Sequence, residues 1–345
     1  MAAVQADCVQ LRQEFLVRYY LISSKYKRRI NMALAVKIEN LVKRYKELIA
    51  LDHFSLEINE GEIFGLLGPN GSGKTTTINC LLSLLDYDKG TVEVFGKKMT
   101  PESYDIKKNI GVVMQNVAVF EQLTVRENID FFCGLYIRDK AKRKQYVDEA
   151  IEFVGLGDFE KFYPKKLSGG LLRRLNIACG IAHKPKLIIF DEPTVAVDPQ
   201  SRNKILEGIK KLNEDGATVI YTSHYMEEVE QLCTRILIMD KGKSLASGTK
   251  QELKKMIKNT ETIEIEISSL TEDNLREIEK LPHAYDVSYD GSRLCVNYSG
   301  GKHNLTRILE YMNTHELLFG RVYSELPTIN DVFLEITGKE LRDSN

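Results

Sequence analysis

Residues 68–75 of this chain read Gly68-Pro-Asn-Gly-Ser-Gly-Lys-Thr75, and the fold can be predicted outward from them. It matches the phosphate-binding pattern G-x-x-x-x-G-K-[ST], and it lies between an apolar run (63–67) and a helical run (75–85). Glycines let backbone N–H groups turn inward around phosphate oxygens, and the helix N-terminus adds partial positive charge. Lys74 then supplies a point charge for the phosphates, and the Thr75 hydroxyl is a predicted magnesium ligand.

Four further apolar runs read as strands, at residues 110–114, 187–190, 219–221 and 236–239. Helical segments of about ten or more residues separate most of them, which is the βαβ pattern of a covered parallel sheet. Residues 124–183 read as mainly helical, and Thr124-Val-Arg-Glu127 is a capping box that opens one of these helices. The pattern predicts an α/β fold built on a parallel sheet.

Two carboxylates, Asp191 and Glu192, directly follow the apolar run at residues 187–190. An acid at the carboxyl end of a buried strand, beside a phosphate loop, is where a nucleotide-bound magnesium ion is held. We therefore interpret Asp191 as the metal-associated acid. Glu192 is suited to orient or deprotonate an attacking water. With the phosphate loop, this pair predicts a nucleoside triphosphatase.

A second glycine-rich segment, Leu167-Ser-Gly-Gly170, opens a helical run instead of following a strand. It offers a second anion site made of a serine hydroxyl and glycine amides. With this segment between Gln115 and Asp191, the chain resembles the nucleotide-binding domains of ATP-binding cassette transporters over roughly residues 34–248. The resemblance implies a P-loop NTPase cassette with a parallel-sheet core, an antiparallel β-subdomain and a helical subdomain at about residues 120–184.

The resemblance also assigns roles to single residues. It implies that Gln115 senses magnesium and the membrane partner, that His224 contacts the γ-phosphate, and that Asp198 lies at a dimer seam. It implies that Tyr45 stacks on adenine, although Tyr45 could instead pack on the β-subdomain. The implied catalytic residues are Glu192, His224 and Gln115, and the implied metal ligands are Thr75, Gln115 and Asp191. The implied nucleotide-binding residues are Tyr45, Gly68, Pro69, Asn70, Gly71, Ser72, Gly73, Lys74, Thr75, Thr76, Ser168, Gly169, Gly170 and Asp198.

Two positions depart from the pattern of the family. Leu171 stands where a glutamine or methionine is common, so a side-chain hydrogen bond to the partner site is expected to be missing. Ala196 stands where glycine is usual, which would stiffen the dimer-seam loop if that position requires a positive φ. We expect both departures to affect the catalytic rate more than the function.

The chain divides into three predicted parts: an extension (1–31), the ATP-binding domain (32–258) and a small α+β accessory domain (259–345). In the last part, residues 262–267 and 294–298 alternate as strands do, and residues 273–281 and 305–312 read as helices. A lysine-rich connector, residues 254–258, is expected to be an exposed hinge at which truncation leaves the cassette intact. Residues 330–342 and 191–202 resemble bacterial drug- and ion-export ATPases paired with six-helix permeases.

The first 31 residues differ in character from the rest. Residues 12–29 carry six basic residues and one acid, interleaved with apolar side chains. We expect a poorly ordered extension, or upstream sequence preceding a natural start at Met32. A basic amphipathic helix on a membrane surface is the alternative.

Composition excludes several classes of protein. The chain has 345 residues, a net charge of −1, 43% hydrophobic residues and 28% charged residues, so a folded core is expected rather than global disorder. Near-neutral charge argues against a nucleic-acid partner. The six cysteines form no C-x-x-C pair, and no stretch approaches 18 uninterrupted apolar residues.

These observations and the resemblance together predict the ATP-hydrolysing subunit of an export system, using ATP and Mg²⁺. Its predicted partners are an integral membrane permease and a second ATPase subunit, most simply a second copy of this chain. It is expected to act peripherally on the cytoplasmic face of the cell membrane. The alternative is a soluble ATPase of the same family with a role in cofactor assembly or another process besides transport.

Overall fold

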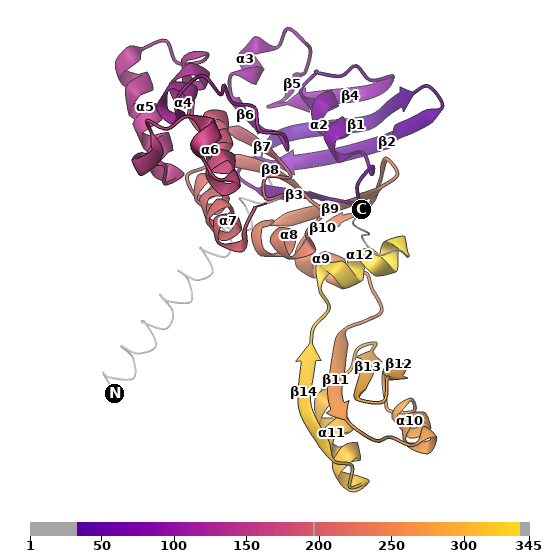
Figure 1. The fold of residues 1–345 in the computed structure, drawn as a ribbon. Helices are drawn as coiled ribbons and strands as arrows, with labels where there is room; N and C mark the ends of the chain where they lie inside the picture. The colour runs from indigo at the N-terminus through magenta and orange to yellow at the C-terminus, as the bar shows by residue number, and fades with distance from the viewer. Residues whose placement is uncertain (1–32, 196, 339–345) are drawn as a thin grey trace, which may run out of the picture.

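The structure is a computed structural model that describes residues 33–195 and 197–338 (Figure 1). The predicted extension at residues 1–31, the departure at Ala196 and the end of the tail after Gly338 lie outside the described residues. None of the helices in the described part has the length and apolar character needed to span a bilayer.

The central sheet has six strands in the order β10-β9-β3-β8-β7-β6. Strands β3, β6, β7, β8 and β9 pair in parallel, and β10 pairs antiparallel at the edge. The bounds are β3 (Ile63–Leu67), β6 (Ile110–Val113), β7 (Leu187–Asp191), β8 (Thr218–Ser223), β9 (Arg235–Asp240) and β10 (Lys243–Gly248). Every residue of β3, β7 and β8 is buried, because helices or the second sheet cover both faces. The predicted α/β fold and all five predicted parallel strands are confirmed.

A second, antiparallel sheet has the order β2-β1-β4-β5. Its strands are β1 (Leu34–Tyr45), β2 (Leu48–Asn59), β4 (Lys89–Val94) and β5 (Lys97–Lys98). One apolar cluster joins this sheet to the central sheet and to helix α2 (Lys74–Leu81), with Ile38, Leu66 and Ile78 among its buried members. This sheet is the antiparallel β-subdomain that the resemblance implied.

A layer of helices lies beside the free edge of β6 and over one side of the sheet (Figure 1). The helices on this side are α4 (Val125–Gly134), α5 (Lys140–Phe153), η1 (Gly157–Phe159), η2 (Pro164–Lys166), α6 (Gly169–Ile181), α7 (Pro199–Glu214), α8 (Met226–Leu232) and α9 (Lys250–Lys254). Helix α3 (Tyr104–Lys107) lies apart from them, with its Ile106 in the apolar cluster of the antiparallel sheet. The predicted capping box at α4 is present, since Thr124 and Glu127 each bond the backbone N–H of the other. Residues 124–183 are mainly helical, as predicted.

The C-terminal sheet has the antiparallel order β12-β13-β11-β14. Together with its two helices it forms the β-α-β-β-α-β arrangement of ferredoxin-like domains. The elements are β11 (Glu261–Ile267), α10 (Glu272–Ile278), β12 (Ala284–Tyr289), β13 (Arg293–Tyr298), α11 (Asn304–Thr314) and β14 (Phe319–Glu325). The alternating residues of β11 place Ile263, Ile265 and Ile267 in its own apolar core. The sequence pattern indicated β11, β13 and both helices but did not indicate β12 or β14.

The last helix, α12 (Ile329–Thr337), leaves this unit and packs beside α8 and α9 (Figure 1). Its Ile329, Val332 and Phe333 are buried in the apolar cluster of the cassette, not in that of β11–β14. The backbone N–H of Ile329 also donates to Glu230 of α8 at 3.1 Å. Residues after 258 therefore supply part of the cassette core, which differs from the expectation of a simple hinge there.

Candidate functional site

The phosphate loop connects β3 to α2 and has the backbone that its glycines permit. Gly71 and Gly73 adopt φ values of 79° and 109°, where other residues are strained. A Cβ on Gly68 would lie 2.4 Å from the carbonyl oxygen of Met239. Glycine is therefore favoured at these three positions, and the resulting turn brings the loop onto the N-terminus of α2.

Lys74 lies inside this loop and is 5% exposed. Its ammonium group donates to the carbonyl oxygens of Gly68 at 2.7 Å and Pro69 at 3.2 Å. Burial lowers the pKa of Lys74, and the adjacent Glu192 opposes that shift. The hydroxyl of Ser72 is buried and has no hydrogen-bond partner among the described residues. The loop therefore holds a buried cation and an unsatisfied hydroxyl, a donor set suited to a phosphate group.

Asp191 ends β7 and is held by two hydroxyl groups. Thr75 donates to its Oδ2 at 3.1 Å, and Thr222 donates to its Oδ1 at 2.7 Å. Thr222 also accepts the backbone N–H of Glu192 at 3.0 Å. Parallel register places Thr222 opposite Asp191 at the carboxyl ends of β8 and β7. Thr222 was not among the predicted site residues, although a hydroxyl residue next to the end of the predicted strand at residues 219–221 was a signal for it.

Glu192 is the residue on which the other predicted catalytic side chains converge. Its carboxylate lies 3.4 Å from Lys74 Nζ and 3.4 Å from His224 Nδ1, and it accepts from Gln115 Nε2 at 3.2 Å. The side chain is 8% exposed, and its backbone has φ 49°, the left-handed region that non-glycine residues rarely adopt. Four segments far apart in sequence thus meet at one carboxylate.

The remaining predicted residues lie in other places. Ser168 caps α6, accepting the N–H of Leu171 at 3.3 Å, and Asp198 caps α7, accepting that of Ser201 at 2.9 Å. The Ser201 bond lowers the pKa of Asp198. A Cβ on Gly170 would lie 3.1 Å from Asp198 Oδ2, so Gly170 and Asp198 adjoin. Their described contacts form a second cluster, which shares no residue with the cluster around Glu192.

Tyr45 and Leu171 have simpler surroundings. Tyr45 ends β1 at the tip of the hairpin, and its ring is about half exposed with the ammonium of Lys43 5.2 Å from its centroid. The ring is therefore available for stacking, and that role stays a prediction. Leu171 packs against the apolar cluster of the cassette, which gives a packing reason for an apolar residue at this departure from the family.

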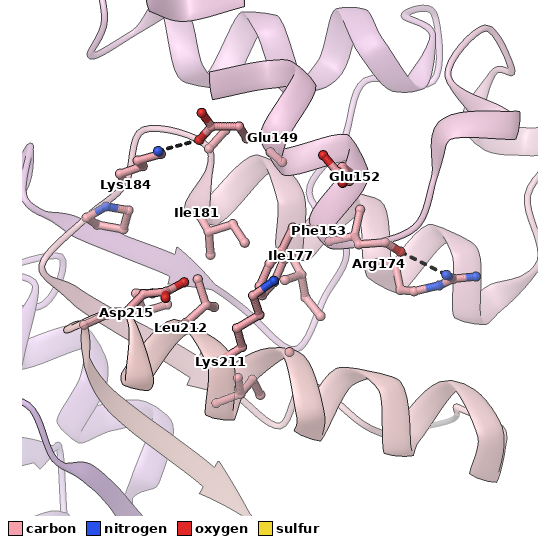
Figure 2. A pocket seen from close by; sticks show the side chains of 18 of the residues that line it. Glu149, Glu152, Phe153, Arg174, Ile177, Ile181, Lys184, Lys211, Leu212 and Asp215 are labelled. Carbon is pink, nitrogen blue, oxygen red and sulfur yellow. Dashed lines mark hydrogen bonds and ion pairs between the residues drawn. The ribbon is translucent and has the colours of Figure 1, made fainter. Parts of the chain in front are cut away.

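A pocket of about 1070 Å³ lies between α5, α6 and α7 and is lined by none of the predicted site residues (Figure 2). Its floor is apolar, with Ile177, Ile181 and Leu212. Of the charged groups in it, Lys184 pairs with Glu149, and Arg174 donates to the carbonyl oxygen of Val154. The pocket therefore lies apart from the loop around Lys74 and from the other predicted site residues.

Comparisons with known proteins agree on one family. A family model described as ABC transporter matches residues 51–195. The linearmycin resistance ATP-binding protein LnrL of Bacillus subtilis is 40% identical over 89% of this chain and 100% of its own length. The daunorubicin resistance ATP-binding protein DrrA3 of Streptomyces coeruleorubidus is 31% identical, over 89% and 97%. The Nod factor export ATP-binding protein I of Ralstonia nicotianae is 32% identical, over 89% and 95%.

A solved structure gives the same indication. The ATP-binding cassette MJ0796, in a dimeric post-hydrolysis state bound to ADP and Pi, matches with 31% identity and a TM-score of 0.58. The match covers 62% of this chain and 98% of that chain. None of these matches supports the alternative of a soluble cofactor-assembly ATPase.

Proposed function

We propose a site and a working cycle for this chain on the premise that it belongs to the ABC transporter family, as the ATP-hydrolysing subunit of an export system. ATP binds with its β- and γ-phosphates in the loop around Lys74, and Tyr45 stacks on adenine. Hydrolysis drives a separate integral membrane permease, with this chain bound peripherally at the cytoplasmic face. The relatives are named for antibiotic resistance and Nod factor export. We therefore propose that this system exports a small organic molecule, which the permease selects.

The convergence on Glu192 is the observation that carries the proposal. A water molecule held by the Glu192 carboxylate attacks the γ-phosphorus, forming the new P–O bond while the bond to the β–γ bridging oxygen breaks. The water proton passes to Glu192, and the leaving oxygen departs with ADP. Lys74 and His224, both 3.4 Å from this carboxylate, are placed to meet the γ-phosphate oxygens. Gln115, bonded to the same carboxylate, reports the state of the site to the loop that follows it.

The residues around Asp191 fit a magnesium ion. Carboxylate and hydroxyl oxygens are the ligands that Mg²⁺ takes in nucleotide sites, where it keeps waters and phosphate oxygens as further ligands. Asp191 and Thr75 already lie within hydrogen-bond distance of one another, and Gln115 is the third proposed ligand. When bound, the ion neutralises charge on the β- and γ-phosphates.

The separation of the two clusters supports a dimer. Within the described contacts, Gly170 adjoins Asp198 and Ser168 bonds Leu171, and neither contacts the loop around Lys74. We propose that each nucleotide is completed by Ser168–Gly170 of a second subunit, most simply a second copy.

A test of this function uses the purified chain and the Glu192→Gln variant. We expect the chain to hydrolyse ATP with Mg²⁺, and the variant to bind ATP but lose about 10²–10⁴-fold in turnover, as losing a general base does. Light scattering should then show an ATP-dependent dimer of the variant. Turnover of the variant within twofold of the unmodified chain contradicts the assignment of Glu192.

A further inference from the structure

One buried carboxylate outside this site is bound by three hydroxyl groups at one of its two oxygens. Glu228 of α8 is 3% exposed. Its Oε2 accepts three hydroxyl groups, from Tyr221 at 2.7 Å, Thr194 at 2.8 Å and Ser223 at 3.1 Å. Burial and the adjacent Glu228 charge raise the pKa of Tyr221 well above its usual value, so the phenol stays protonated and donates.

The other oxygen of Glu228 faces a cation. Arg202 Nε of α7 lies 3.3 Å from Oε1. The guanidinium of Arg202 also lies 4.8 Å from the centroid of the Tyr225 ring, and that ring lies 4.2 Å from the ring of His224. The charge of Glu228 is therefore balanced by Arg202, and the same Arg202 supports the side chain next to His224.

The partners of Glu228 come from three segments of the proposed site. Thr194 follows Glu192 by two residues, Ser223 directly precedes His224, and Arg202 follows Asp198 by four residues. Ser223 Oγ also accepts the N–H of Tyr225 at 2.9 Å, so the backbone on both sides of His224 is held. The side chain of Glu228 is therefore connected to the three segments that carry Glu192, His224 and Asp198.

We propose that Glu228 is a positioning residue that fixes the relative positions of His224, Glu192 and Asp198. The proposal rests on the proposed function of Glu192 and His224. Glu228 touches no reacting atom, so its effect is on geometry. It should act on turnover, because misplacement of catalytic groups by about 1 Å can lower rates about 10²-fold. ATP affinity, which depends on the loop around Lys74, should change little.

The experiment compares Glu228→Gln with Glu62→Gln. Gln keeps the size of the side chain and one acceptor but loses the charge that faces Arg202. Glu62 is the matched control, since it is also a buried carboxylate beside an arginine, Arg235 at 3.5 Å, at the start of β3, the end away from the phosphate loop. We expect Glu228→Gln to lower kcat about 10–10²-fold with KM within twofold, and Glu62→Gln to leave both unchanged.

A double-mutant cycle separates positioning from general stability. If Glu228 acts through His224, then His224→Ala should lower kcat much less in the Glu228→Gln background than in the unmodified chain. Additive effects of the two substitutions overturn the proposal, and so does kcat of Glu228→Gln within twofold of the unmodified chain. If Glu228→Gln does not fold, Thr194→Val, which removes one hydroxyl of the same network, is subject to the same cycle and the same criteria.

Failure of this inference and failure of the proposed function give different results. If Glu192→Gln hydrolyses ATP as fast as the unmodified chain, the role of Glu192 in the proposed function fails. If Glu192→Gln is inactive while Glu228→Gln keeps normal kcat, only the positioning role fails.

Discussion

Thr222 holds Asp191 at the end of the neighbouring strand, because its hydroxyl donates to Asp191 Oδ1 at 2.7 Å. The same hydroxyl accepts the N–H of Glu192 at 3.0 Å. One threonine therefore orients the proposed metal acid and the backbone that carries the proposed general base. This relationship depends on the parallel pairing of β7 with β8, in which Asp191 and Thr222 are register partners.

Thr222→Val should lower Mg²⁺-dependent turnover with little loss of ATP binding. Valine keeps the branched shape but removes a hydrogen bond to a charged group, worth about 1.5–3 kcal/mol, or roughly 10–100-fold in rate. Thr218→Val is the matched control, since Thr218 lies buried at the other end of β8 and accepts from Gly61 N at 2.9 Å. Steady-state ATPase assays of both variants across Mg²⁺ concentrations measure the two effects. Equal effects of both substitutions would mean that Thr222 only stabilises the sheet.

Lys74→Ala should lose ATP affinity, because the phosphates lose the buried positive charge that the loop encloses. We expect the dissociation constant to rise at least tenfold, the equivalent of about 1.4 kcal/mol. Calorimetric titration with ATP measures it directly. Lys97→Ala serves as control, since Lys97 is exposed and pairs with Asp105. Unchanged affinity in Lys74→Ala would place the phosphates elsewhere.

The buried side chain of His183 should make the folded protein less stable in acid. Burial lowers its pKa to about 4, while its ring lies 3.2 Å from the carbonyl oxygen of Ile110 and stacks on Tyr136. Between about pH 6.5 and pH 4 the unfolded chain binds a proton that the folded chain does not. The free energy of unfolding should therefore fall as pH falls through this window, by about 3 kcal/mol from this group.

Urea unfolding at pH 7 and pH 4.5 tests this with His183→Gln, which keeps a donor for Ile110 but does not titrate. The variant should lose less stability than the unmodified chain on acidification. His303→Gln, at an exposed histidine, is the matched control. Parallel losses in all three proteins contradict the role of His183.

Helix α12 should stabilise the cassette although it lies at the far end of the chain. Phe333 is 1% exposed within the cassette cluster, so Phe333→Ala should lower the free energy of unfolding of the ATP-binding part by about 3–5 kcal/mol. Met312→Ala, in the core of the β11–β14 unit, is the control and should spare ATP binding. ATP binding measured at increasing urea concentrations shows in which variant the ATP-binding part unfolds first.

Truncation of the chain also tests the contact between α12 and the cassette. A chain ending at Lys258 lacks α12 and leaves the surfaces of α8 and α9 uncovered. We expect it to lose cassette stability, in contrast to the hinge expectation drawn from the lysine-rich connector. A chain in which a flexible linker replaces residues 260–326 and α12 is kept should recover it. Equal stability of the two shortened chains would show that α12 contributes nothing.

The local chemistry of the site is encoded in short stretches of the sequence. The glycines at residues 68, 71 and 73 and the strand–loop–helix order are encoded within a few residues, so the phosphate loop could be predicted from spacing alone. The same holds for the buried parallel strands, whose continuous apolar runs report burial on both faces. Capping at Thr124 is equally local.

Which distant residues meet depends on the tertiary structure. Thr222 reaches Asp191 because β8 pairs with β7. Glu228 meets Ser223 because α8 packs on β8, and it meets Arg202 because α7 packs beside α8. The residues next to a single hydroxyl or carboxylate in the sequence do not indicate which distant side chains it will bind. The same reason applies to α12, whose amphipathic sequence indicates a buried face but not which core buries it. Apolar burial is non-directional, so the choice of partner surface is made by the folded chain as a whole.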